Sequence, residues 1–202
     1  MMKKNLTEIE MVIGNIDDQL VGMGLVQMPA IEEDFVYMKN QNHNYVLSKM
    51  VDDEKGILVS PALIPDKRIY RYNELTNEEY YIWWGAETIR KLSEKFLMDG
   101  YHVNVTEQHE NPVNGVYLIY SWIVENEQDQ IITKWGYDVP VGTWCVAYKV
   151  MNEDIRRKIR NGEIRGVSIE AFMTEKYDTL GRDNHDLIEI INQLKEELGK
   201  IK

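Results

Sequence analysis

Short apolar runs and alternating apolar and polar positions predict a chain made mostly of β-strands. The runs are bounded by turn residues such as glycine, proline and asparagine. Aromatic and β-branched residues are frequent within them, as is typical of strands. The predicted strands span residues 57–63, 68–72, 80–84, 101–106, 116–124, 142–150 and 164–172, with shorter candidates at 35–38 and 45–50.

Apolar residues at helical spacing predict two helices within this series of strands. Residues 86–98 carry one apolar stripe with charged residues opposite, and Gly100 follows as a C-terminal stop. We expect this helix to pack on a sheet. A short basic helix over 153–160 is capped by Asn152 and ends at Gly162.

The two ends of the chain leave alternatives open. Near the N-terminus, Thr7 and Glu10 have the spacing of a helical capping box, yet 12–14 and 20–22 read equally well as strands interrupted by glycine. Near the C-terminus, a final helix has apolar residues spaced four, three, four and three. This helix either folds back on the body or mediates oligomerisation or scaffold docking. Its apolar positions are Leu187, Ile191, Leu194, Leu198 and Ile201.

Composition and charge narrow the function classes. The net charge of −11 argues against binding nucleic-acid phosphates over a broad face. No apolar run reaches the roughly 18 residues of a membrane span, and no apolar signal segment follows the basic N-terminus. A single cysteine, Cys145, excludes an internal disulfide and is expected to be a buried, inert thiol. No cysteine and histidine cluster has zinc spacing, so neither metal nor cofactor is expected.

One serine and one histidine are the candidate chemical groups. Ser168 lies in the predicted strand that follows Gly162, and His109 ends another extended run. They form a nucleophile and its base if the fold brings them together; otherwise each has only a structural role. Glu170 replaces the second glycine of a G-x-S-x-G nucleophile elbow, so an α/β-hydrolase is not indicated. His102 is expected to be structural.

Seven short motifs occur in a fixed order between residues 57 and 172. They are VSPALIP at 59–65, YYIWW at 80–84, NVTEQH at 104–109, SWIV at 121–124, VGTW at 141–144, KV at 149–150 and GVSIE at 166–170. In this order they resemble the prohead (capsid-maturation) serine proteases of tailed phages, in particular the XkdF-like branch. The resemblance covers somewhat more than half of the chain.

The resemblance implies Ser168 as nucleophile and His109 as general base, with a third group that orients the histidine. The family's glutamate aligns with Tyr120, which cannot stabilise an imidazolium as a carboxylate does. Glu125 is therefore the candidate third member. The fallback candidates are Glu127 and Asp138.

The sequence also suggests roles for other groups near Ser168. Backbone N–H groups are expected to form the oxyanion hole, because no neighbouring side chain is an obvious donor. Arg165 either orients substrate or is a surface charge beside Glu163, and Gly166 permits close approach of the chain.

The strand count and the resemblance to assemblin-like proteases predict an α+β fold with a mostly antiparallel, barrel-like core and peripheral helices. We expect an N-terminal extension over 1–50, whose place in the core is open, a protease-like domain over 51–178 and an amphipathic helix over 179–202.

The function implied is a serine endopeptidase that cleaves scaffolding and capsid proteins, and itself, inside the phage prohead in the host cytoplasm. It would form a homo-oligomer through its C-terminal helix and bind neither nucleic acid nor membrane. The alternative is a protease-like structural protein, weak or inactive in catalysis, that acts in capsid assembly. Self-cleavage distinguishes the two.

Overall fold

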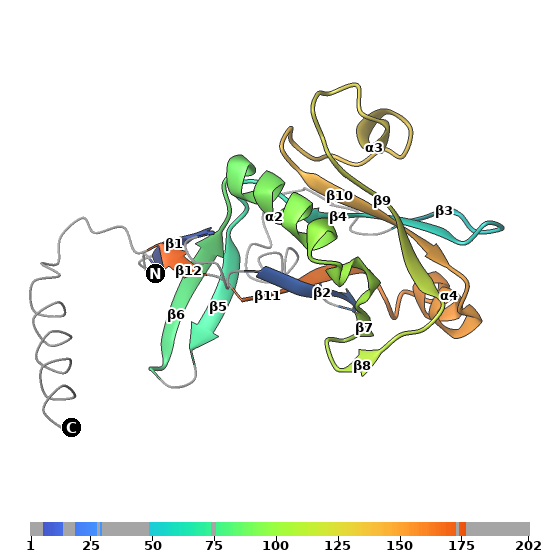
Figure 1. Ribbon diagram of the computed structural model, residues 1–202, viewed down its shortest axis with the longest axis horizontal. Coiled ribbons are helices and arrows are strands. Elements are labelled where there is room, and N and C mark those ends of the chain that lie inside the picture. Colours follow the sequence, from blue (N-terminus) through green and yellow to red (C-terminus); the bar gives the residue numbers. More distant parts are fainter. Residues whose placement is uncertain are drawn as a thin grey trace, which may run out of the picture.

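The computed structural model describes residues 6–13, 19–27, 29, 49–73, 76–172 and 174–176. Within them, the strands form three four-stranded sheets (Figure 1), and the buried apolar side chains form one cluster. Each sheet joins strands that are far apart along the chain. The third sheet carries the candidate site.

The first sheet has the strand order β12-β1-β6-β5. β1 pairs in parallel with β6 and antiparallel with β12. The first and the last strands of the described chain are therefore neighbours in this sheet. The bounds are β1 Thr7–Val12, β5 Ile69–Asn73, β6 Glu78–Trp83 and β12 Thr174–Lys176.

The second sheet has the order β3-β4-β10-β9, and all its pairings are antiparallel. β4 and β10 are buried along almost their whole length, which explains why their sequences are continuous apolar runs rather than alternating ones. β9 forms one edge of this sheet. The bounds are β3 Lys49–Asp52, β4 Ile57–Leu63, β9 Val116–Ile123 and β10 Trp144–Val150.

The third sheet has the order β11-β2-β7-β8. β2 lies in its interior, antiparallel to β11 and parallel to β7. One face of β2 is fully buried through Met23 and Leu25, while its other face carries Gly22 and Gly24. The bounds are β2 Gln19–Val26, β7 Val105–Glu107, β8 Asn111–Pro112 and β11 Gly166–Phe172.

The helices lie outside the sheets, and α2 is the longest of those described. α2 contacts β2 of the third sheet and both β9 and β10 of the second. Phe96 of α2 meets Trp144 edge to face, with ring centroids 5.6 Å apart. The bounds are α2 Ala86–Met98, the 3₁₀ turn η2 Tyr101–Val103, α3 Gln130–Thr133 and α4 Glu153–Arg160.

The predicted α+β class is confirmed. Among the described strands every pairing is antiparallel except β1–β6 and β2–β7. These strands form separate sheets and no closed barrel, so the barrel-like arrangement stays a prediction. No helix within the described residues is long and apolar enough to cross a membrane.

Most predicted elements match the structure, and two differences stand out. Residues 101–106 were predicted as one strand, but Tyr101–Val103 forms a 3₁₀ turn and β7 begins only at Val105. The short helix α3 was not predicted, because its four residues are too few to show a helical period. Near the N-terminus, the strand alternative is the correct one. The candidate strand at 35–38, most of the one at 45–50 and the C-terminal heptads lie outside the described residues.

Candidate active site

Ser168, Gly24 and Thr106 lie in one row across three neighbouring strands. The register pairs Ser168 of β11 with Gly24 of β2, and Gly24 with Thr106 of β7. Directly paired residues in a sheet direct their side chains to the same face. The Ser168 hydroxyl and the Thr106 hydroxyl therefore project from the same face, with a position between them that has no side chain.

The ring of His109 fills this empty position. A Cβ atom built on Gly24 would lie only 2.6 Å from His109 Cε1 and 2.7 Å from Nδ1. The imidazole therefore lies over Gly24, which is the strand partner of Ser168 and, in a sheet, about 5 Å from it between Cβ positions. The chain segments that carry the two predicted groups are thus brought together. Among the described atoms no hydrogen bond joins Ser168 to His109, and such bonds are often loose before substrate binds.

His109 reaches Gly24 because the chain makes a tight turn after β7. Gln108 and His109 have φ angles of 54° and 60°, in the left-handed region that non-glycine residues rarely adopt. The Glu110 N–H donates to the Glu107 carbonyl at 3.1 Å and closes the turn. The Gln108 N–H donates to the Leu25 carbonyl at 3.0 Å, which fixes the turn to β2. Two strained residues at a candidate site are consistent with a functional constraint.

Glu170 contacts the Nδ1 atom of the His109 ring. Its Oε1 atom lies 3.0 Å from His109 Nδ1 and accepts a hydrogen bond from the Thr106 hydroxyl at 2.6 Å. Glu170 pairs with Gly22, two residues from the Ser168–Gly24 pair, and therefore lies on the same face as Ser168. A Cβ atom on Gly22 would be 3.2 Å from Glu170 Oε2, so the glycine leaves room for the carboxylate.

An ion pair outside this group supports the turn. The Lys158 ammonium of α4 lies 2.6 Å and 2.9 Å from the two carboxylate oxygens of Glu107, the last residue of β7. The hydrogen bond that the ammonium donates to Glu107 raises the pKa of Lys158, against a smaller lowering by desolvation. Lys158 thereby links α4 to the strand that leads into the His109 turn.

Ser168, His109 and Glu170 are the types of group that can perform acid–base and nucleophilic chemistry together. When His109 Nδ1–H donates to the Glu170 carboxylate, the Nε2 lone pair is left to accept a proton. The Ser168 hydroxyl, which projects from the same sheet face opposite Gly24, has a proton to give. Ser168 is 8% exposed, whereas the side chains of His109 and Glu170 are 37% and 24% exposed. His109 and Glu170 are therefore accessible from solvent, whereas Ser168 is nearly buried.

The sequence-predicted third members lie elsewhere. The Glu125 carboxylate is 2.7 Å from the Arg90 guanidinium of α2, and Tyr120 is 66% exposed on β9, the edge of the second sheet. Glu127 and Asp138 are exposed in the connection between β9 and β10. The acceptor that the structure places against His109 is Glu170. Arg165 is exposed directly before β11, and Gly166 begins the strand opposite Val26.

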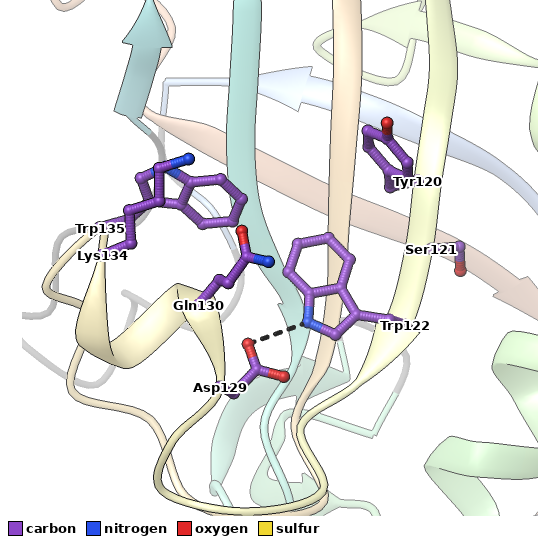
Figure 2. A pocket seen from close by; sticks show the side chains of 7 residues that line it. All are labelled: Tyr120, Ser121, Trp122, Asp129, Gln130, Lys134 and Trp135. Atoms are coloured by element: carbon purple, nitrogen blue, oxygen red, sulfur yellow. Dashed lines mark hydrogen bonds between the residues drawn. The ribbon is translucent and has the colours of Figure 1, made fainter.

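A pocket of about 510 Å³ lies between β9 and α3, and neither Ser168, His109 nor Glu170 lines it. In Figure 2 the Trp122 indole points to Asp129 of the α3 cap, and the hydrogen bond between them is 3.3 Å. Trp135 packs against Trp122 with ring centroids 6.2 Å apart. The pocket is lined by Tyr120, Ser121, Trp122, Asp129, Gln130, Lys134 and Trp135.

Cys145 is fully buried in β10, as predicted, and burial raises the pKa of its thiol. A reactive thiolate at this position is disfavoured. In the part of the chain that the structure describes, no cluster of histidine, cysteine and carboxylate side chains has the arrangement of a metal site.

Sequence reasoning missed Glu170 and the two glycines on the neighbouring strand, Gly22 opposite Glu170 and Gly24 opposite Ser168. Glu170 was considered only as a departure from the nucleophile elbow. The available signal was the pair of glycines two residues apart in β2, because glycine within a strand often marks the close approach of another group. Gly22 and Gly24 leave space for the Glu170 carboxylate and the His109 ring.

Comparison with known proteins identifies the family. No curated protein and no solved structure matches the chain. A family model described as "Putative phage serine protease XkdF" matches residues 51–177, which is more than half of the chain and includes both Ser168 and His109. The chain therefore belongs to the XkdF family of phage serine proteases.

Proposed function

We propose that this protein is a capsid-maturation serine endopeptidase, with Ser168 as nucleophile and His109 as general base. It acts inside the phage prohead in the host cytoplasm, on scaffolding and capsid proteins and on itself. Family membership supports proteolysis in general. The placement of the His109 ring over Gly24, the strand partner of Ser168, is the observation that carries the assignment of the two residues.

The reaction follows from the two groups. Ser168 Oγ attacks the carbonyl carbon of the scissile peptide bond while His109 Nε2 takes the hydroxyl proton. The tetrahedral intermediate collapses, the C–N bond breaks, and His109 gives its proton to the leaving amine. Water then attacks the acyl-enzyme with His109 again as base, which releases the acid product and restores Ser168. Backbone N–H groups near Ser168 are the proposed donors to the oxyanion.

The experiment is the intact mass, over time, of the chain co-expressed with the scaffolding or capsid protein encoded beside it. Discrete cleavage is expected with the wild-type chain and not with Ser168→Ala or His109→Ala. His102→Ala is the matched control, because His102 lies in η2 outside the site, and it should cleave like wild type.

Two results would count against the proposal. Cleavage that persists in Ser168→Ala would assign the nucleophile to another residue. Intact substrates and intact protein with the wild-type chain would instead favour a protease-like structural protein that acts in capsid assembly.

A further inference from the structure

We infer that Glu170 is the positioning carboxylate of the site, the group that orients His109 and fixes which of its nitrogens carries the proton. This role is the one for which Glu125 was the sequence-based candidate. The inference rests on the proposed function, in which His109 is the base. It adds that the nucleophile and the positioning carboxylate come from the same strand, two residues apart.

The first support is the direct contact. Glu170 Oε1 is 3.0 Å from His109 Nδ1, within the range of a hydrogen bond between an imidazole N–H and a carboxylate. The competing carboxylate, Glu125, is 61% exposed and is engaged with Arg90. Tyr120 lies on β9 with its side chain 66% exposed. Among the candidates within the described residues, only Glu170 touches His109.

The second support is that Glu170 is itself held in place. A glutamate has three rotatable side-chain bonds, and a carboxylate that orients another group has to be fixed by its own surroundings. The Thr106 hydroxyl donates to the same Oε1 atom at 2.6 Å, and Thr106 is fixed by the pairing of β7 with β2. Gly22, the strand partner of Glu170, has no side chain that would fill the space next to Oε2. The Thr106 hydrogen bond and the space at Gly22 therefore favour one position for Glu170.

The third support is chemical. A carboxylate only accepts hydrogen bonds, so its contact selects the Nδ1–H form of neutral His109 and leaves the Nε2 lone pair free. When His109 takes the serine proton, the negative charge of Glu170 stabilises the imidazolium that forms. In serine proteases whose positioning aspartate is changed to asparagine, the rate falls about 10⁴-fold although the geometry is kept, because the wrong tautomer is present.

The kinetic test uses a peptide spanning the self-cleavage site and compares two substitutions of Glu170. Glu170→Gln removes the charge and keeps the shape, and Glu170→Met removes every hydrogen-bonding atom. Both should lower kcat by on the order of 10²–10⁴-fold with KM changed only a few-fold, because Glu170 acts on the transition state through His109. Glu110→Gln is the matched control: it removes the same charge from the exposed residue next to His109 and should leave kcat unchanged.

The spectroscopic test reports on His109 without any need for cleavage. The ¹⁵N shifts of ¹⁵N-histidine-labelled protein distinguish the Nδ1–H and Nε2–H forms, and His109→Ala identifies the His109 signals among the four histidines. We expect the Nδ1–H form in the wild-type protein and a gain of the Nε2–H form in Glu170→Met.

The outcomes separate this inference from the proposed function. If Glu170→Met cleaves like Glu110→Gln, or lowers kcat with the His109 tautomer unchanged, the positioning role is overturned. The same holds if Glu125→Gln, rather than Glu170→Gln, abolishes cleavage. If the wild-type chain does not cleave but the tautomer changes as expected in Glu170→Met, the hydrogen bond is established and it is the protease assignment that fails.

Discussion

The imidazole of His109 occupies the space that a side chain at Gly24 would fill. A Cβ atom there would approach Cε1, Nδ1 and Nε2 of the ring to 2.6, 2.7 and 3.1 Å, well inside normal contact. His109 can therefore take this position only because Gly24, 85 residues earlier in the chain, has no side chain.

This contact predicts the effect of Gly24→Ala. The new methyl group displaces the ring, and a displacement of about 1 Å costs roughly 10²-fold in rate. We therefore expect cleavage to fall by about that factor while circular dichroism shows a retained fold. Gly85→Ala is the control, because a Cβ atom at Gly85 meets only Glu10 Oε1, at 3.5 Å. Equal cleavage rates in the two variants would show that His109 acts from another position.

Gln108 offers a test of strain in the turn. Its φ of 54° is costly for a residue with a side chain and easy for glycine. Gln108→Gly should raise the free energy of unfolding by about 1 kcal/mol, measured by urea denaturation. Gln128→Gly, at a position without a positive φ, should give no such gain. A loss of stability beyond that of the hydrogen bond from the Gln27 N–H to Gln108 Oε1, which the variant also removes, would mean that the turn is not strained.

Two buried tyrosines predict opposite effects of the same substitution. The Tyr148 hydroxyl is fully buried and has no hydrogen-bond partner among the described residues, whereas the Tyr137 hydroxyl donates to the Val59 carbonyl at 2.6 Å. Tyr137→Phe should lower the free energy of unfolding by about 1 kcal/mol, because it leaves that carbonyl without its donor. Tyr148→Phe should be neutral or stabilising, since an unpaired buried hydroxyl is removed. Thermal denaturation of both variants checks the pair, and a comparable loss in Tyr148→Phe contradicts it.

The Lys158–Glu107 ion pair predicts a pH dependence of stability. Because the folded state raises the pKa of Lys158, the protonated lysine favours folding. Its contribution is complete below the unfolded lysine pKa of about 10.4 and is lost as the pH rises through the higher folded-state pKa. The difference in unfolding free energy between wild type and Lys158→Met should be constant between about pH 7 and about pH 9 and shrink above that. A difference that is unchanged at high pH would indicate that lost packing, not charge, is responsible.

The sequence predicted the elements whose pattern is local. The helix over 86–98 shows its period over several turns, and the structure gives it the same bounds. Asn152 caps α4 as expected, with its side-chain oxygen accepting from the N–H groups of Asp154 and Ile155. The runs of β4 and β10 are buried on both faces and are recognisable as strands without knowledge of their neighbours.

The sequence did not predict the features that depend on pairing between distant strands. Strand order decides that Ser168 faces Gly24 and that Thr106 lies beyond it, and no local pattern contains that order. Glu170 was overlooked as a positioning group because it lies in the same strand as Ser168, whereas its partner His109 is 61 residues away in the sequence. Glu125 was named only because Tyr120 stands at the family's glutamate position, and the sequence says nothing about its distance from His109.

The interior place of β2 in the third sheet has a consequence for any proteolytic trimming of the N-terminal region. β2 is the strand that connects β11, which carries Ser168, to β7, which leads to His109. It lies outside residues 51–177, the part of the chain that the family model matches. A cut that releases residues 19–26 would therefore separate the two halves of the candidate site and switch it off, even though every residue proposed to take part in the reaction would remain in the larger fragment.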